Sequence, residues 1–279
     1  VEGGVDAFTI RSSSFHKSES FFEEQKDSPS ATTAWVSLGL EQPLVIAMVG
    51  LPARGKSYIV KMTIRYLKWI GFECKVFNVG AYRRKHGMAA ADSNFFDGNN
   101  MEAQQIREDM AVAVQDEMYQ WLRQGAGHSQ RVAVFDATNT TIKRRQGLAL
   151  RSRSENAFLL FVESICDDQE VLTRNYDLKL QNEDYKGMTL EAARADFLER
   201  VHAYEKVYET IEDYEDSNQI CYIKLINVGQ KVITRNCHGY LPSQVAFYLQ
   251  NVHIHPRKIY LSITSEGVRE LQKGGGMLG

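Results

Sequence analysis

Residues 44–57, which read LVIAMVGLPARGKS, set the architecture of this chain. The first six are all apolar, as is typical of a strand buried on both faces of a sheet. The next eight read G-x-x-x-x-G-K-S, and helical periodicity follows to residue 69. Glycines let such a loop curl its N–H groups around an anion, and the following helix adds the positive end of its dipole. An ordinary strand-to-helix turn is the alternative, but the strand–loop–helix setting favours a phosphate-binding loop.

Apolar and helical patterns alternate along the rest of the chain. Further strands are predicted at residues 74–79, 132–135, 158–162, 221–226 and 231–237. Helices are predicted at residues 101–122, 168–178, 190–209 and 241–251. Alternation of buried strands with helices indicates an α/β protein with a mostly parallel central sheet and helices on both faces. Together with the phosphate-binding loop, this pattern predicts a P-loop kinase fold.

Composition excludes several classes of protein. The chain has 279 residues, 43% hydrophobic and 24% charged, and 33 basic against 35 acidic residues give a net charge of -2. This balance argues against nucleic-acid binding through bulk charge, and no apolar run is long enough to predict a membrane span. The cysteines, Cys74, Cys166, Cys221 and Cys237, have no metal-finger spacing, so we expect free thiols and a cytoplasmic location.

Two residues of the loop and one carboxylate are candidates for chemistry. Lys56 would place a charge at the β- and γ-phosphates of a nucleotide, and the Ser57 hydroxyl would bind Mg²⁺. Asp136 comes directly after the apolar run 132–135. Because parallel strands end at one crevice, we expect Asp136 beside Lys56 and Ser57, where it would hold Mg²⁺, orient an incoming hydroxyl, or do both. Taken alone, such an aspartate is more often a helix cap.

Arginines gather after the predicted strand ends although the net charge is near zero. Arg83 and Arg84 follow the second strand, Arg107 stands near the start of the long helix, and Arg144 and Arg145 follow the third strand. Guanidinium groups bind phosphate in a bidentate manner. The molecule whose hydroxyl accepts a phosphoryl group from the nucleotide is therefore expected to carry a phosphate already. Each cluster taken singly also fits a solvated surface. A long basic stripe interleaved with aromatics is missing, which disfavours nucleic acid as the partner.

Five segments together resemble the kinase half of the 6-phosphofructo-2-kinase/fructose-2,6-bisphosphatase family. They are residues 50–57, 75–84, 100–107, 134–141 and 163–168. The likeness spans roughly 43–261. It implies transfer of the γ-phosphoryl group of ATP, with Mg²⁺, to the 2-hydroxyl of fructose 6-phosphate, giving fructose 2,6-bisphosphate. The family commonly forms dimers, so the resemblance allows a homodimer.

The resemblance also implies a role for individual residues. The nucleotide contacts would be Gly50, Leu51, Pro52, Ala53, Arg54, Gly55, Lys56, Ser57, Asn175 and Lys179. The sugar-phosphate contacts would be Arg83, Arg107, Thr138, Arg144, Lys179, Arg200 and Tyr204. The catalytic residues would be Asp136, Lys56 and Cys166, and the metal ligands Ser57 and Asp136. Composition alone would make Arg200 a surface residue and Tyr204 a packing residue, although their spacing puts them on one helix face.

Three parts of the chain follow from these observations. Residues 1–42 are serine-rich with little apolar periodicity, which predicts disorder. Residues 43–252 would form the kinase domain, and residues 253–279 a stub or tail where the family's phosphatase domain begins. No histidine follows His255, so we expect no phosphatase activity from this chain.

Two other functions stay open at this stage. One is a P-loop kinase for another small hydroxyl acceptor, such as a nucleoside. The other is an inactive nucleotide-binding regulator, which the presence of Lys56, Ser57 and Asp136 argues against.

Overall fold

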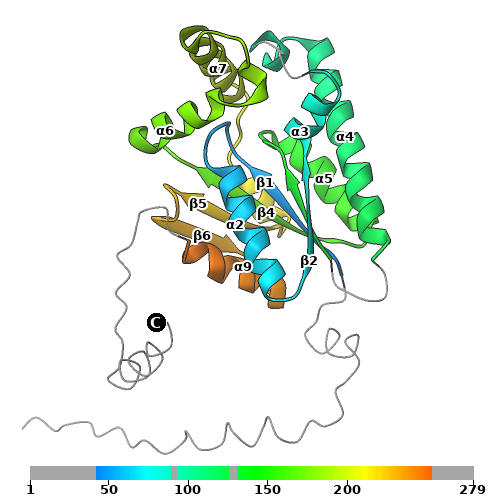
Figure 1. Ribbon diagram of the computed structural model, residues 1–279. Coiled ribbons are helices and arrows are strands. Elements are labelled where there is room, and N and C mark those ends of the chain that lie inside the picture. The colour runs from blue at the N-terminus through cyan, green and yellow to red at the C-terminus, as the bar shows by residue number, and fades with distance from the viewer. Residues whose placement is uncertain (1–41, 89–92, 126–130, 253–279) are drawn as a thin grey trace, which may run out of the picture.

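The computed structural model describes residues 42–88, 93–125 and 131–252 (Figure 1). The predicted serine-rich leader and the predicted stub or tail therefore lie outside the described residues, apart from Gln42. No helix among the described residues is long and apolar enough to cross a membrane.

The described residues form one sheet of six strands, in the order β2-β3-β1-β4-β5-β6. The strands are β1 (Leu44–Val49), β2 (Glu73–Asn78), β3 (Arg131–Asp136), β4 (Phe158–Ile165), β5 (Cys221–Ile226) and β6 (Lys231–Arg235). All neighbouring pairs are parallel except β5 and β6. The strand order reverses at β1, because β3 flanks it on one side and β4 on the other. Ligands of such sheets bind in the crevice that opens at this point, beyond the carboxyl ends of the strands.

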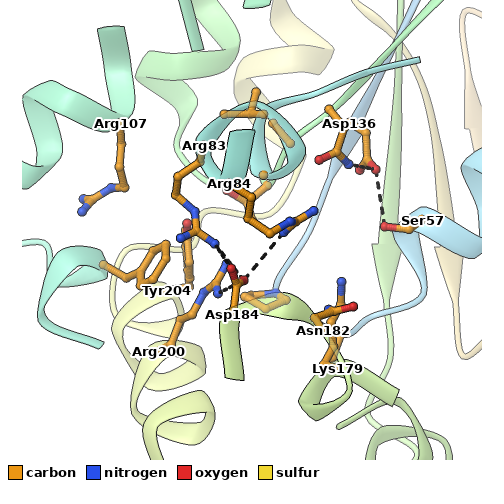
Figure 2. Close-up of a pocket in the computed structure, with 18 of the residues that line it drawn as sticks. Ser57, Arg83, Arg84, Arg107, Asp136, Lys179, Asn182, Asp184, Arg200 and Tyr204 are labelled. Atoms are coloured by element: carbon orange, nitrogen blue, oxygen red, sulfur yellow. Dashed lines mark hydrogen bonds and ion pairs between the residues drawn. The ribbon is translucent and has the colours of Figure 1, made fainter. Parts of the chain in front are cut away.

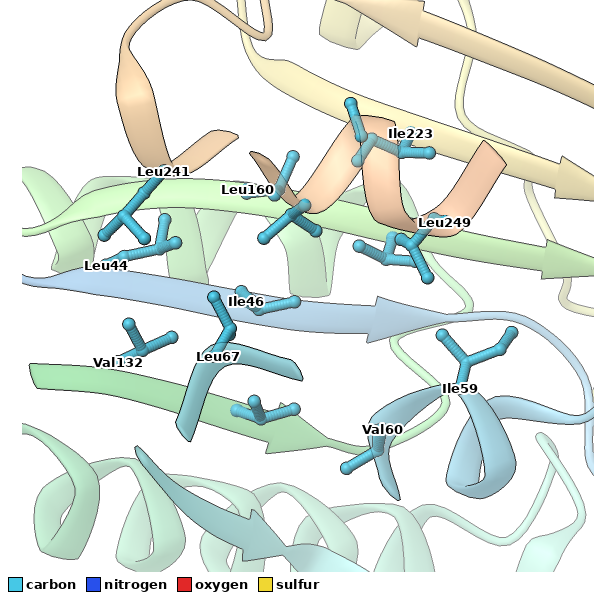
Figure 3. Close-up of a cluster of buried hydrophobic side chains, with 14 of the residues drawn as sticks. Leu44, Ile46, Ile59, Val60, Leu67, Val132, Leu160, Ile223, Leu241 and Leu249 are labelled. Carbon is cyan, nitrogen blue, oxygen red and sulfur yellow. The ribbon is translucent and has the colours of Figure 1, made fainter. Parts of the chain in front are cut away.

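Helices cover both faces of the sheet, and β1 shows why. Alternate residues of a strand point to opposite faces. Leu44, Ile46 and Met48 pack with α2 (Lys56–Trp69) and α9 (Tyr240–Gln250) on one face (Figure 3). Val45, Ala47 and Val49 pack with α4 (Met101–Arg123) and α5 (Ile142–Ser154) on the other. β1 is thus buried on both sides, as its unbroken apolar sequence predicts.

Shorter elements and two helices stand over the carboxyl ends of the strands (Figure 1). They are α3 (Val79–Lys85), the 3-10 turns η1 (Ser93–Phe96) and η2 (Glu183–Tyr185), α6 (Gln169–Leu180) and α7 (Leu190–Glu205). A small apolar cluster joins Ala53 of the loop to Tyr185 and to Phe197 and Val201 of α7. The segment α8 (Asp213–Ser217) then leads into β5.

The predicted fold class is confirmed, with a few differences in the elements. The sequence patterns did not predict α3 or α5, because neither segment shows a clear apolar period. Each helix begins at a polar N-cap residue. The Asn78 side chain accepts a hydrogen bond from the Ala81 N–H, and the Thr141 side chain accepts one from the Arg144 N–H. α7 ends at Glu205 rather than at residue 209. The Glu209 N–H instead donates to the Thr140 carbonyl at 2.8 Å, which joins this segment to the loop between β3 and α5.

Candidate active site

The loop after β1 has a backbone that only glycine permits at its first position. Gly50 has a φ of 134°, in the region that side-chain-bearing residues rarely adopt. A Cβ atom on Gly50 would lie 2.5 Å from the Ser164 carbonyl oxygen. The Gly50 N–H also donates to the Thr138 carbonyl at 2.9 Å, which joins the loop to the segment after β3. The phosphate loop is therefore held in one shape by its neighbours on both sides.

Polar side chains from other elements hold the middle of the loop. The Ser164 hydroxyl donates to the Arg54 carbonyl, and the Asn175 amide of α6 donates to the Ala53 carbonyl at 2.9 Å. The Arg54 guanidinium points away from the crevice, toward the Tyr176 hydroxyl (3.2 Å) and the Glu205 carboxylate (3.4 Å). These contacts attach the loop to α6 and α7.

Lys56 lies inside the loop with its side chain almost wholly buried. Its Nζ donates to the carbonyls of Gly50, at 2.8 Å, and Leu51, at 2.5 Å. Burial lowers the pKa of Lys56 to about 7, and the nearby Asp136 carboxylate acts in the opposite direction. An anion in the loop would favour the charged form of this amine.

Asp136 and Ser57 meet at the end of β3 (Figure 2). The Ser57 hydroxyl donates to Asp136 Oδ2 at 3.4 Å. The Asn78 amide donates to the same carboxylate oxygen, because Asn78 and Asp136 are register partners at the ends of β2 and β3. A hydroxyl and a carboxylate are the oxygen donors that Mg²⁺ prefers, so these two side chains fit that ion. Within the described ranges, no group of three or more His, Cys, Asp and Glu residues could hold a metal by itself.

A pocket of about 370 Å³ opens between these residues and the elements above the sheet (Figure 2). It brings together predicted site residues from six segments of the chain. They are Pro52, Ala53, Lys56, Ser57, Arg83, Arg107, Asp136, Thr138, Arg144, Lys179, Arg200 and Tyr204. Figure 2 shows the arginines gathered at one end and Asp136 with Ser57 at the other.

Asp184 organises the arginine end, and sequence reasoning missed it. Both of its oxygens accept from Arg83 Nη2, at 2.8 and 2.7 Å. Arg200 lies 3.5 Å and Arg84 3.7 Å from the same carboxylate. The single charge of one buried aspartate is thus shared by three guanidinium groups, so this cluster keeps a net positive charge. No motif marks this residue, because its role depends on arginines that are about a hundred positions away or on another helix.

Two arginine side chains keep a nitrogen without a partner. Arg144 Nε and Arg200 Nε are buried and make no hydrogen bond within the described part of the chain. Burying such a donor is costly unless a ligand satisfies it. Both side chains line the pocket, as does Arg107, whose pKa burial lowers. Unsatisfied guanidinium donors beside a pocket are suited to a phosphate group.

Two phenylalanines, also missed from the sequence, form the apolar wall of this end. The Arg200 guanidinium lies 3.8 Å from the centre of the Phe96 ring, and that of Arg107 lies 5.7 Å from the centre of the Phe95 ring. Tyr204 packs beside Phe96 at 5.9 Å between ring centres. Cation–π contacts of this kind orient the guanidinium planes. A run of two aromatics ahead of a helix gives no signal of such a role.

Three further candidate residues from the sequence do not line the pocket. Cys166 packs with Val171 and Leu172 in a small apolar cluster and does not line the pocket, and burial raises the pKa of its thiol. The contacts of its side chain in this structure are packing contacts, and its catalytic role stays a prediction. Asn175 holds the Ala53 carbonyl from outside the pocket. Arg145 is fully buried against Glu215 and does not share the phosphate-facing position of Arg144.

Comparisons with known proteins identify the family of this chain. The family model described as 6-phosphofructo-2-kinase matches residues 31–256. A protein of Schizosaccharomyces pombe named Probable 6-phosphofructo-2-kinase is 43% identical over 82% of this chain and 34% of its own length. The 6-phosphofructo-2-kinase/fructose-2,6-bisphosphatase of Caenorhabditis elegans is 43% identical over 79% of this chain and 49% of its own. The 6-phosphofructo-2-kinase/fructose-2,6-bisphosphatase of Aquarana catesbeiana is 42% identical over 79% of this chain and 46% of its own length. The chain thus spans a third to a half of the length of these relatives.

Proposed function

Because this chain belongs to the 6-phosphofructo-2-kinase family, we propose that it transfers the γ-phosphoryl group of ATP to the 2-hydroxyl of fructose 6-phosphate. The product would be fructose 2,6-bisphosphate. One observation carries the proposal: a phosphate loop with Asp136 beside it and a cluster of arginines with unsatisfied donors face each other across one pocket. A nucleotide fits the first and a phosphorylated acceptor the second.

The loop end of the pocket is suited to Mg²⁺ and ATP. Backbone N–H groups of the loop and the start of α2 would bind the β-phosphate, and Lys56 would neutralise charge on the γ-phosphate. Ser57 and Asp136 would hold Mg²⁺, which when bound supplies further neutralisation of the phosphates. When the nucleotide is bound, the Lys56 amine would give up its hydrogen bonds to the loop carbonyls and would contact the transferred phosphoryl group instead.

The arginine end is suited to the 6-phosphate of the sugar. Arg107, Arg144 and Arg200 would bind the phosphate oxygens, and the Tyr204 hydroxyl would add a further donor. Fixing the phosphate there would bring the 2-hydroxyl toward Asp136, which would orient it for in-line attack. Phosphoryl transfer needs mainly such alignment and charge neutralisation.

We also propose that residues 43–252 are the kinase unit, that it acts in the cytoplasm and that it forms a homodimer. The free thiols of Cys74, Cys166, Cys221 and Cys237 support a reducing compartment.

Size-exclusion chromatography with light scattering tests the proposed homodimer. A monomer at micromolar concentration would contradict it.

A panel of acceptors tests the proposed reaction. ATP consumption is measured with fructose 6-phosphate, with other sugar phosphates and with nucleosides, and ³¹P NMR identifies the product. We expect the highest rate with fructose 6-phosphate and a new phosphate on the 2-hydroxyl. A nucleoside preference would support a different P-loop kinase. Nucleotide binding without turnover of any acceptor would support a regulator instead.

A further inference from the structure

Two cysteines meet at the end of the sheet that is far from the pocket. Cys221 begins β5, so it lies at the end opposite to the carboxyl ends where the pocket opens. Cys237 follows β6, the antiparallel edge strand. The two sulfur atoms are 3.5 Å apart although the residues are 16 positions apart in sequence. Antiparallel pairing places them together, since Tyr222 and Arg235 are register partners just inside them.

The surroundings of the two thiols differ in a way that separates their roles. Cys221 is 4% exposed and belongs to the apolar core, whereas Cys237 is only partly buried and reaches solvent. The Cys221 thiol donates a hydrogen bond to Cys237 Sγ. This bond lowers the pKa of Cys237 and raises that of Cys221. The accessible sulfur is thus the better nucleophile, and a second sulfur is already in contact with it.

The rest of the chain offers no comparable arrangement among the described residues. Cys74 lies on β2, at the far edge of the sheet from β6, and burial raises its pKa to about 12. Cys166 is buried beside Val171 and Leu172. Neither contacts another sulfur within the described part of the chain, so Cys74 and Cys166 serve as internal controls for a pairing specific to Cys221 and Cys237.

We propose that Cys221 and Cys237 form a reversible intramolecular disulfide when the protein meets a hydroperoxide. The Cys237 thiolate attacks the terminal peroxide oxygen, the O–O bond breaks, and water or an alcohol leaves after protonation, which makes a sulfenic acid at Cys237. The Cys221 sulfur then attacks Cys237 Sγ. An S–S bond forms, the S–O bond breaks, and the hydroxyl leaves as water with the proton of Cys221. The two sulfurs supply the two electrons that reduce the peroxide.

The bond needs little movement of the chain. A disulfide has an S–S length of about 2 Å, so side-chain rotation covers most of the difference from the present contact. The disulfide would link the segment between the edge strand β6 and α9 covalently to β5. Because the pair lies at the amino end of β5, the pocket keeps its shape. We therefore expect the oxidised protein to unfold at a higher temperature while it keeps its nucleotide-binding affinity.

Peptide mapping of the full chain tests the proposal. The protein is treated with hydrogen peroxide, alkylated with N-ethylmaleimide, digested without reductant and analysed by mass spectrometry. We expect a cross-linked pair of peptides containing Cys221 and Cys237, a loss of about 2 Da and recovery of both thiols with dithiothreitol. Cys74→Ser and Cys166→Ser should still form the bond, and Cys237→Ser should not.

A second variant separates the two steps. In Cys221→Ser, dimedone should label Cys237 after peroxide treatment, since the sulfenic acid has no partner. The proposal is overturned if both thiols stay alkylable at a peroxide dose that fully oxidises glutathione, if the cross-link joins two chains, or if it contains Cys74 or Cys166. Dimedone labelling of Cys221 in Cys237→Ser, with none of Cys237 in Cys221→Ser, would overturn the assigned order.

Discussion

The two ends of the pocket are built by different means. At the loop end, contiguous residues 50–57 would supply the proposed binding groups, most of them backbone N–H groups of a loop whose shape depends on the conformation of Gly50. At the other end, each arginine comes from a separate element: Arg83 from α3, Arg107 from α4, Arg144 from α5 and Arg200 from α7. The loop end is therefore determined by local sequence, and the arginine end by tertiary packing.

This difference predicts how each end responds to substitution. Backbone donors cannot be removed one at a time, so the loop end is damaged by a change of backbone shape or of the few charges at its mouth. The guanidinium groups of the arginine end can be removed singly, and each removal should weaken one ligand while the other ligand binds as before.

The largest effect is expected for Asp136→Ala, at the loop end of the pocket. Loss of the carboxylate removes the partner of Ser57 and of the acceptor hydroxyl, and turnover should fall by about 10³-fold. Steady-state rates with fructose 6-phosphate measure this. Asp109→Asn, an exposed position on α4, is the matched control. Full turnover by Asp136→Ala would remove this residue from the mechanism.

Gly50→Ala should distort the loop end selectively. The new Cβ would meet the Ser164 carbonyl, so the loop must shift at a cost of about 1–3 kcal/mol, and half-saturation for ATP should rise at least about 10-fold. Gly147→Ala is the control, because a Cβ there meets nothing within 4 Å and alanine favours the α5 helix. Unchanged ATP affinity in Gly50→Ala would contradict the account of the loop.

Arg107→Ala should weaken the arginine end alone. Losing one charge-assisted contact to phosphate costs about 1.5–3 kcal/mol, so half-saturation for fructose 6-phosphate should rise about 10- to 100-fold with ATP affinity unchanged. Arg123→Ala, at the other end of the same helix, controls for loss of an arginine from α4. A rise in the half-saturation for ATP of equal size would mean that the two ends are not independent.

Lys179→Met gives the smallest expected effect, and it depends on pH. Burial lowers the pKa of Lys179 below its unfolded value, and Arg200 acts in the same direction. The folded state therefore disfavours the charged amine, which costs stability below the folded pKa and is relieved as pH rises through it. The melting temperature of ligand-free Lys179→Met should exceed that of the parent by a few degrees at pH 7 and by less at pH 10. The exposed Lys143→Met should show no such trend, and a gain of equal size at both pH values would contradict the prediction.

Local patterns predicted most of the fold. The strands and the longer helices follow from apolar runs and helical periodicity, and the loop follows from its own residues. The helices α3 and α5 were missed because their start depends on single capping side chains, Asn78 and Thr141, rather than on a period.

The same division holds for the site. Arg144 and Arg145 are neighbours with the same chemistry, yet one lines the pocket and the other is buried against Glu215. A helix turns by about 100° per residue, so adjacent positions face different surroundings. Only the fold decides which of the two faces the ligand. Asp184 and Phe96 were missed for the same reason, since their roles exist only through the arginines that packing brings to them.

Equilibrium binding of the acceptor tests the central claim most directly, namely that the arginine end recognises a phosphate. Titration calorimetry compares fructose 6-phosphate with fructose, both in the presence of Mg²⁺ and a non-hydrolysable ATP analogue. The account predicts that fructose 6-phosphate binds at least about 100-fold more tightly, because buried guanidinium donors stay unsatisfied with fructose. Equal affinity for the two sugars would contradict it.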